Sequence, residues 1–302
     1  MRLSEYRARF VQVVNDSNYW LLGIALGLIA LHLQLYWRLT GNFSHISLEL
    51  IGWSAVFYSL WHRRHDLMLQ RSPISQFVGW FLIAILLVRG ANLRGAQSII
   101  LSVTPLLIGL AIALISVGFK QFKHYQRELW LIFIMAIPTE FLVQGVDRII
   151  HSTVLTAKYA HILMWYLGFL VERKGTQLVM PSGAVDIYLG CSGLEAAIVS
   201  LKVALFFLLV YPTRSREKLL IPAIAVLSAF IINGFRVIFL AYLVSKQDTA
   251  GFEYWHGDQG AQIFSMISMT ILTTYCQILM ERGKPEFASV EPTPEELEQS
   301  SR

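Results

Sequence analysis

Charged residues are scarce in this chain of 302 residues: only 15% are Asp, Glu, Lys or Arg, while 55% are hydrophobic. A soluble domain with so little charge and so much apolar surface would not stay dispersed in water. The scarcity of charge therefore argues against an ordinary soluble enzyme and predicts an integral membrane protein.

Cysteine is scarce as well, because Cys191 and Cys276 are the only two in the chain. One lies on a turn and the other inside an apolar run, which is not the pattern of a disulfide framework or a zinc site. The eight histidines lack the spacing of ligands on one helix face, so no metal and no cofactor are predicted. The net charge of +5 comes without a basic stripe of interleaved aromatics, so nucleic acid is not an expected partner.

Long apolar runs are what the sequence has in abundance. A helix crosses a bilayer with about 17–25 apolar residues. Eight runs approach this length, two of them short, and they predict an all-α polytopic membrane protein with about eight transmembrane helices in the lipid bilayer. The predicted spans are residues 19–37, 46–61, 77–90, 98–119, 129–145, 192–211, 219–245 and 257–280.

The basic residues between these runs predict the orientation of the chain. Lys and Arg cluster in the N-terminus and in the second, fourth and sixth connections, whereas the seventh connection, 246–256, contains only Lys246. Because basic loops stay in the cytoplasm, both termini are predicted inside and the odd-numbered loops outside. The expected location is a bacterial cytoplasmic membrane.

The long fifth connection contains two further features. Residues 159–171 form an aromatic apolar run that is too short to span, which favours an interfacial or re-entrant helix; if this run spans, the orientation of everything before it inverts. Residues 177–190 alternate around a Pro-Ser-Gly-Ala turn, which predicts a small β-hairpin leading into the sixth span. The predicted parts are a cytoplasmic N-terminus 1–18, transmembrane helices 19–145, an exoplasmic loop 146–191, catalytic transmembrane helices 192–283 and a disordered cytoplasmic tail 284–302.

The end of this loop carries the first candidate for chemistry, Cys191. Gly190, Ser192 and Gly193 flank it just before an apolar helix begins. Backbone N–H groups at a helix start favour an anion, so they stabilise a thiolate or receive the oxyanion of an attacked carbonyl. The alternative is an inert small hydrophobe, which is the interpretation given to Cys276.

Arg236 is the second candidate, because it lies inside the apolar run 229–242. An intramembrane arginine is by default a functional residue. Counting back from residue 245 at about 1.5 Å per residue places it roughly 13 Å below the outer surface. Asn233, one turn earlier, shares its face and would orient the guanidinium. The alternative is a snorkelling arginine or one paired with a helix carboxylate.

His256 is the third candidate, just before the last span and on the same predicted face of the membrane. An imidazole there can take the thiol proton and later return it to a leaving amine. The alternative is a histidine in an interfacial aromatic belt. His45, His151 and His161 are also predicted outside and remain possible substitutes.

Three carboxylates, Glu49, Glu140 and Glu195, are predicted a few residues below the outer surface. Charges at that depth need partners, and the available cations are Arg236 and Lys202. A structural ion-pair network is the favoured interpretation. In the alternative, one of the carboxylates supports the arginine or the histidine.

These motifs resemble the exosortase/archaeosortase family, including its cyanoexosortase variant. The resemblance rests on Cys-Ser-Gly-Leu opening a span, Asn-x-x-Arg at 233–236 inside a later span and a histidine before the last one, and it covers about residues 130–275. It implies a membrane cysteine protease or transpeptidase. The implied substrates are exported, membrane-anchored proteins with a C-terminal sorting signal, made of a Pro-Glu-Pro-type motif, a transmembrane helix and a basic end.

The resemblance also implies a role for each residue. Cys191 would be the nucleophile, Arg236 the stabiliser of oxyanion or thiolate, and His256 the acid and base, with an unidentified acyl acceptor and no cofactor. The chain departs from many members at Glu195, where they have arginine or a small residue, and this departure bears on substrate preference.

Three other functions remain open from the sequence. A transporter would use Arg236 and the carboxylates as a substrate or ion path, and a non-catalytic assembly factor would only bind sorting-signal proteins. Both would tolerate loss of the Cys191 thiol. An enzyme acting on lipid or glycan would use Arg236 to bind phosphate and would form no peptide adduct.

Overall fold

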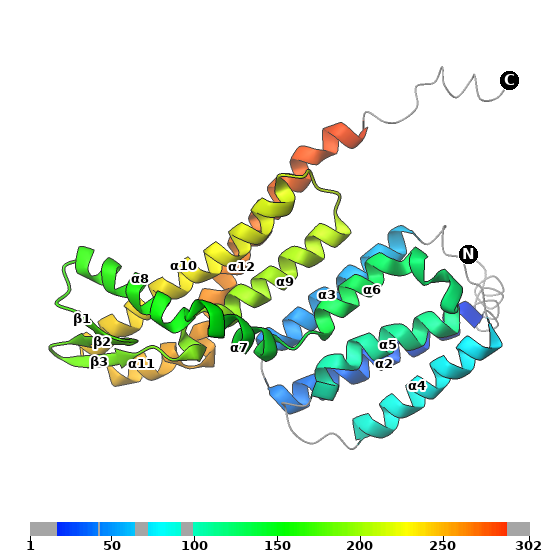
Figure 1. The fold of residues 1–302 in the computed structure, drawn as a ribbon, viewed down its shortest axis with the longest axis horizontal. Helices are drawn as coiled ribbons and strands as arrows, with labels where there is room; N and C mark the ends of the chain where they lie inside the picture. The colour runs from blue at the N-terminus through cyan, green and yellow to red at the C-terminus, as the bar shows by residue number, and fades with distance from the viewer. Residues whose placement is uncertain (1–16, 42, 64–71, 92–98, 289–302) are drawn as a thin grey trace, which may run out of the picture. The chain divides into compact units, whose positions relative to one another are not determined.

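The computed structural model describes residues 17–41, 43–63, 72–91 and 99–288 (Figure 1). The chain divides into two units that are considered separately below. The N-terminal unit comprises Met1–Arg148 with Leu205–Pro212, and the C-terminal unit comprises Ile149–Ala204 with Thr213–Arg302. The predicted cytoplasmic N-terminus lies almost wholly outside the described residues, and so does most of the predicted tail.

The N-terminal unit is built of helices. Helix α4 packs on α5, α5 also contacts α2 and α6, and α6 contacts α3. The helices are α2 (Ser17–Thr40), α3 (Phe43–His62), α4 (Pro73–Ala91), α5 (Ile99–Ser116), a 3₁₀ helix η1 (Phe119–Tyr125), α6 (Gln126–Ala136) and α7 (Thr139–Ile150).

Polar side chains are buried inside this unit. His32 on α2 lies with its Nε2 3.4 Å from Oε2 of Glu49 on α3, and both side chains are buried. Glu128 on α6 accepts a hydrogen bond of 2.6 Å from Ser59 and lies 3.6 Å from Arg63. Each of these buried carboxylates therefore has a partner on a neighbouring helix, as charges removed from water require.

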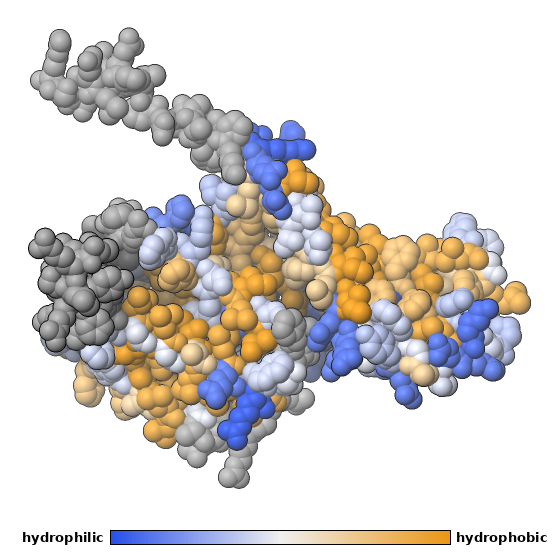
Figure 2. Space-filling view, turned by 180° about the vertical axis from the view of Figure 1, so that it is seen from behind, coloured by the Kyte–Doolittle hydropathy of each residue, from blue (hydrophilic) through white to orange (hydrophobic). Residues whose placement is uncertain are grey.

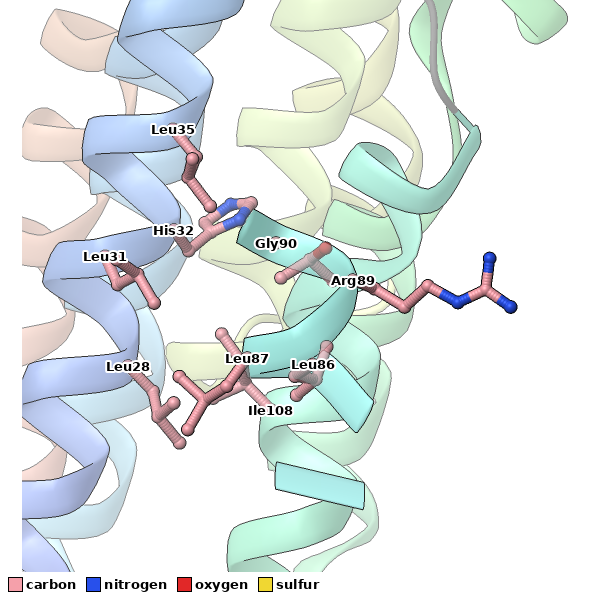
Figure 3. A pocket seen from close by; sticks show the side chains of 10 residues that line it. Leu28, Leu31, His32, Leu35, Leu86, Leu87, Arg89, Gly90 and Ile108 are labelled. Atoms are coloured by element: carbon pink, nitrogen blue, oxygen red, sulfur yellow. The ribbon is translucent and has the colours of Figure 1, made fainter. Parts of the chain in front are cut away.

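A pocket lies between α2, α4 and α5 of the N-terminal unit, and its lining is mostly leucine together with His32 (Figure 3). The side chain of Arg89 extends away from His32. None of the three candidate residues for chemistry lines this pocket.

The C-terminal unit combines helices with a small sheet. Its helices are α8 (Ser152–Tyr166), η2 (Leu189–Cys191), α9 (Leu194–Val210), whose end belongs to the N-terminal unit, α10 (Glu217–Ser245), α11 (Thr249–His256) and α12 (Asp258–Ala288). The antiparallel sheet has the order β1 (Glu172–Lys174), β2 (Gln177–Met180) and β3 (Gly183–Asp186). The sheet, α8 and α11 gather around the C-terminal part of α10 (Figure 1).

The predicted hairpin is present and has a third strand that the sequence did not predict. Met180 pairs with Gly183, so Pro181 and Ser182 form a two-residue turn, and Lys174 pairs with Gln177 across a second turn. The inward side chains of β2 and β3 join a core with α8 and α10, in which Ala157, Ala160 and Met164 of α8 recur at helical spacing.

The predicted helix 159–171 also needs a correction at its ends. It is α8, which begins at Ser152 and ends at Tyr166. His151 precedes it with a left-handed backbone, φ 53°. The helix has 15 residues, which is about 22 Å of rise and less than a bilayer core requires.

The prediction of eight spans is not confirmed. Among the described residues, four helices are long and apolar enough to cross a membrane: Trp20–Thr40, Pro73–Gly90, Glu217–Ser245 and Asp258–Arg282. A bent pair, Phe122–Ala136 with Thr139–Ile150, makes a fifth if it is counted as one span. Both units expose large apolar side chains on these helices, and Figure 2 shows them as orange surface, which suits contact with lipid.

The predicted span 129–145 is wrong as a continuous helix. It breaks after α6, and α7 leaves at 73°. The cause is Pro138, because the residue before a proline is pushed out of the helical region. Ile137 accordingly has φ −73° and ψ 118°, an extended conformation.

Candidate active site

Cys191 lies at the end of η2, immediately before α9, on the turn that the sequence predicted. Its N–H donates to the carbonyl of Tyr188 at 2.9 Å, and the N–H of Ser192 donates to that of Leu189 at 3.1 Å. These two amides are therefore occupied by the turn itself. In this conformation the N–H groups of Cys191 and Ser192 are not available to an oxyanion, and a role for other N–H groups at the start of α9 stays a prediction.

Ser192 and Gly193 fix the shape of the turn. The Ser192 hydroxyl donates to the Leu189 carbonyl at 2.7 Å and accepts from the N–H of Leu194 at 3.3 Å, which caps the start of α9. Gly193 has φ 78°, a left-handed conformation that glycine adopts without strain. A Cβ there would also lie 2.6 Å from the side chain of Asn233.

Two side chains from other helices hold this turn by its carbonyl groups. The amide nitrogen of Asn233 on α10 donates to the carbonyl of Cys191 at 2.9 Å. The hydroxyl of Thr156 on α8 donates to the carbonyl of Ser192 at 2.8 Å. Asn233 thus supports the cysteine turn by a hydrogen bond to its carbonyl group, and its predicted role in orienting the guanidinium of Arg236 stays a prediction.

His256 is the histidine that lies beside the cysteine. Its Nε2 is 3.6 Å from Sγ of Cys191, which is within hydrogen-bonding distance for sulfur. It ends α11, whose N-cap Asp248 accepts from the N–H of Gly251 at 2.8 Å. The imidazole is stacked on Phe252, one turn earlier, with ring centroids 5.1 Å apart and planes 13° apart.

Arg236 is buried, with only 5% of its surface exposed, and contacts the backbone at the end of α11. Its Nη2 donates to the carbonyl of His256 at 2.7 Å, and Nε and Nη2 lie 3.4 Å from the carbonyl of Trp255. A buried guanidinium is stabilised when carbonyl oxygens accept from it. In the part of the chain that the structure describes, Nη1 makes no hydrogen bond and remains available to a substrate.

The charge of this arginine affects the histidine. Burial, and next the positive charge of Arg236, lower the pKa of His256 below its ordinary value. The imidazole is therefore neutral at neutral pH, and a neutral imidazole is the form that accepts a proton from a thiol.

Tyr188 belongs to the same site, although the sequence gave no signal for it. Its hydroxyl lies 3.0 Å from Nε2 of His256, the atom that also faces the thiol. Partial burial, followed by a hydrogen bond to Cys191, raises the pKa of Tyr188, so the phenol keeps its proton. Only the tertiary fold brings residues 188 and 256 together.

The three predicted carboxylates lie on different elements. Glu195 on α9 is exposed, and its predicted depth in the membrane stays a prediction. Glu140 is likewise exposed and belongs to the N-terminal unit. Of the three predicted carboxylates Glu49 is the buried one, and within the N-terminal unit it lies 3.4 Å from His32. The described residues contain no group of three or more acidic, histidine or cysteine side chains able to hold a metal ion.

The arrangement brings a thiol, a neutral imidazole and a guanidinium together from three separate elements. A neighbouring base and a cation are what an activated cysteine nucleophile needs. Cys276 on α12 is likewise a free and buried cysteine, but its thiol makes no hydrogen bond among the described residues.

Comparison with known proteins identifies a family. Residues 37–273, well over half of the chain, match the family model described as transmembrane exosortase (Exosortase_EpsH). No curated protein and no solved structure matches. The match includes all three candidate residues as well as the helices around them, and on this basis the chain belongs to the transmembrane exosortase family.

Proposed function

We propose that this protein is a membrane cysteine endopeptidase or transpeptidase. Its substrates would be exported, membrane-anchored proteins with a Pro-Glu-Pro-type C-terminal sorting signal, cut at the exoplasmic face of the cytoplasmic membrane. The observation that carries the proposal is the separation of 3.6 Å between Sγ of Cys191 and Nε2 of His256, beside a buried Arg236. Membership of the exosortase family supports the same substrate class.

The first half of the reaction follows from this geometry. His256 takes the proton of the Cys191 thiol on Nε2, and the sulfur attacks the carbonyl carbon of the scissile peptide. Negative charge then develops on the carbonyl oxygen, and the free Nη1 of Arg236 donates to it. The C–N bond breaks, the leaving amine takes the proton that the His256 imidazolium gives up, and an acyl thioester remains on Cys191.

The second half resolves the thioester. Water, or the amine of an acceptor, attacks the acyl carbon while His256 again accepts the proton. The sulfur leaves as a thiolate and regains its proton from the imidazolium. Hydrolysis gives a free carboxylate, and attack by an amine gives a new amide bond.

The proposal is tested by processing in cells. A tagged substrate with such a C-terminal signal is co-expressed with wild type, Cys191→Ala, Arg236→Ala or His256→Ala, and its electrophoretic mobility is compared. The expected result is a shift in wild type that each substitution abolishes or reduces at least about 100-fold. Cys276→Ala is the matched control and should process normally.

The same assay separates the competing functions. Processing that persists in Cys191→Ala would exclude the thioester mechanism. Substrate that co-purifies with both wild type and Cys191→Ala, without a shift in either, would instead favour a non-catalytic binding role.

A further inference from the structure

One atom of the site has two partners. Nε2 of His256 lies 3.6 Å from Sγ of Cys191 and 3.0 Å from the hydroxyl of Tyr188. A ring nitrogen holds a single proton or a single lone pair in the ring plane, so it serves one of these partners at a time. The thiol and the phenol therefore share the proton site on which the proposed reaction depends.

The two partners differ in their access to a substrate. Cys191 has 5% of its surface exposed, whereas Tyr188 has 53% exposed. One face of the imidazole is covered by Phe252, and the carbonyl of the same histidine is held by Arg236. A leaving amine that departs toward the exposed side consequently meets the phenol before it meets Nε2.

From this arrangement we propose that Tyr188 is a catalytic residue that relays the proton from His256 to the leaving amine. This inference rests on the proposed peptidase function. The imidazolium N–H passes its proton to the phenol oxygen while the phenol O–H passes its own to the departing nitrogen. The C–N bond breaks, and both Tyr188 and His256 end neutral, with no oxidation or reduction.

The relay also works in reverse. When water or an acceptor amine attacks the thioester, its proton goes to the phenol oxygen and the phenol proton goes to Nε2. The charged and titratable groups facing Tyr188 fit this role. They are Cys191, His256, Arg236 and Asp258. Partial burial, then Cys191 and Asp258, raise the pKa of Tyr188 while Arg236 opposes them, so the phenol stays protonated and able to donate.

The ring of Tyr188 has a separate packing role that the test must exclude. A Cβ on Gly190 would lie 2.9 Å from this ring, so the tyrosine covers the backbone next to the cysteine. Tyr188→Phe keeps the ring and removes only the hydroxyl. Tyr166→Phe, at an exposed position on α8, is the matched control.

The experiment compares two probes with the full-length protein in detergent micelles. Both are the same Pro-Glu-Pro-containing peptide, in one case joined to an alkylamine as an amide and in the other to p-nitrophenol as an ester. The amine needs a proton to leave and nitrophenolate does not. A third measurement, the rate of Cys191 alkylation by iodoacetamide, reports on the thiol without any substrate.

The relay predicts that Tyr188→Phe lowers kcat/KM for the amide by about 100-fold, the scale of a general-acid contribution. The value of kcat/KM for the ester, which reports acylation alone, and the rate of alkylation should stay within about threefold of wild type. Equal losses on amide and ester, or an amide rate that does not fall, would overturn the relay while leaving the peptidase intact. A wild type that cleaves neither probe would contradict the proposed function itself, and the relay with it.

Discussion

At the scale of the residue, the site depends on how a short turn presents one thiol. The carbonyl of Cys191 accepts a hydrogen bond from Asn233, and its N–H donates to the carbonyl of Tyr188. These two bonds fix the backbone of Cys191 and thereby the direction of its side chain. The sequence predicted Cys191, Arg236 and His256 because a helix start, an intramembrane charge and a loop histidine are local signals. It did not predict Tyr188, because that contact depends on where α11 lies.

Gly193→Ala should damage this turn. A left-handed alanine costs about 1–2 kcal/mol, and the added Cβ also overlaps Asn233, which must move away from the Cys191 carbonyl. We expect a lower midpoint of thermal unfolding and a loss of processing of about 10-fold or more. Gly168→Ala is the control, because Gly168 has φ 84° with no atom near its Cβ position. Equal effects of the two substitutions would show that the contact with Asn233 is unimportant.

The pH dependence of thiol reactivity should report the charge of Arg236. This charge lowers the pKa of His256, so the neutral base persists to a more acidic pH than for an ordinary histidine. In Arg236→Gln the pKa of His256 should rise. The rate at which iodoacetamide alkylates Cys191 should then begin to fall at a higher pH than in wild type; this fall is the acidic limb of the pH profile. Arg236→Lys keeps the charge and should move the limb less. A limb that stays fixed in Arg236→Gln would contradict this coupling.

At the scale of the element, hydropathy predicted where helices occur but not how they end. The run 129–145 is apolar throughout, and only the geometry of Pro138 divides it into α6 and α7. Strand β1 has the sequence Glu-Arg-Lys, which has no strand preference of its own and is ordered by pairing with β2. In both cases backbone constraints outweighed composition.

The contact between the buried side chains of His32 on α2 and Glu49 on α3 should contribute to the free energy of unfolding. Each substitution to leucine leaves the other polar group without its partner, so each should destabilise the protein by about 1–3 kcal/mol. The double substitution removes both groups and should cost less than the sum by about 0.5–3 kcal/mol. Thermal unfolding of wild type and the three variants in detergent measures this difference, with Leu26→Ala, at an exposed position of α2, as the control. Additive effects would rule out the coupling.

At the scale of the whole molecule, the proposed orientation puts the C-terminal sheet outside the cell and the connection before α10 in the cytoplasm. This orientation is inferred from the distribution of Lys and Arg among the connections. The packing of the helices does not by itself indicate which side of the membrane a connection faces. The prediction of eight spans stays unconfirmed for a reason of length: α9 has 17 residues, at the short end of the range for a transmembrane helix.

Single-cysteine labelling tests the orientation. In a Cys191→Ser/Cys276→Ser background, Glu172→Cys on β1 should react with a membrane-impermeant maleimide in intact cells. Arg214→Cys, before α10, should react only after the membrane is permeabilised. Both positions are exposed, so a failure to react reflects the membrane and not burial. The opposite pattern would place the thiol site on the cytoplasmic face.

The most direct measurement of the central claim is the mass of Cys191 during turnover. Wild type and Cys191→Ala are co-expressed with a tagged sorting-signal substrate, trapped at low pH and digested. Mass spectrometry then locates any acyl adduct, and hydroxylamine tests whether it is a thioester. The proposed thioester mechanism predicts a hydroxylamine-sensitive substrate peptide on Cys191 in wild type and no adduct in Cys191→Ala. Substrate that is cut with no acyl group ever bound to Cys191, or an adduct on another residue, would contradict it.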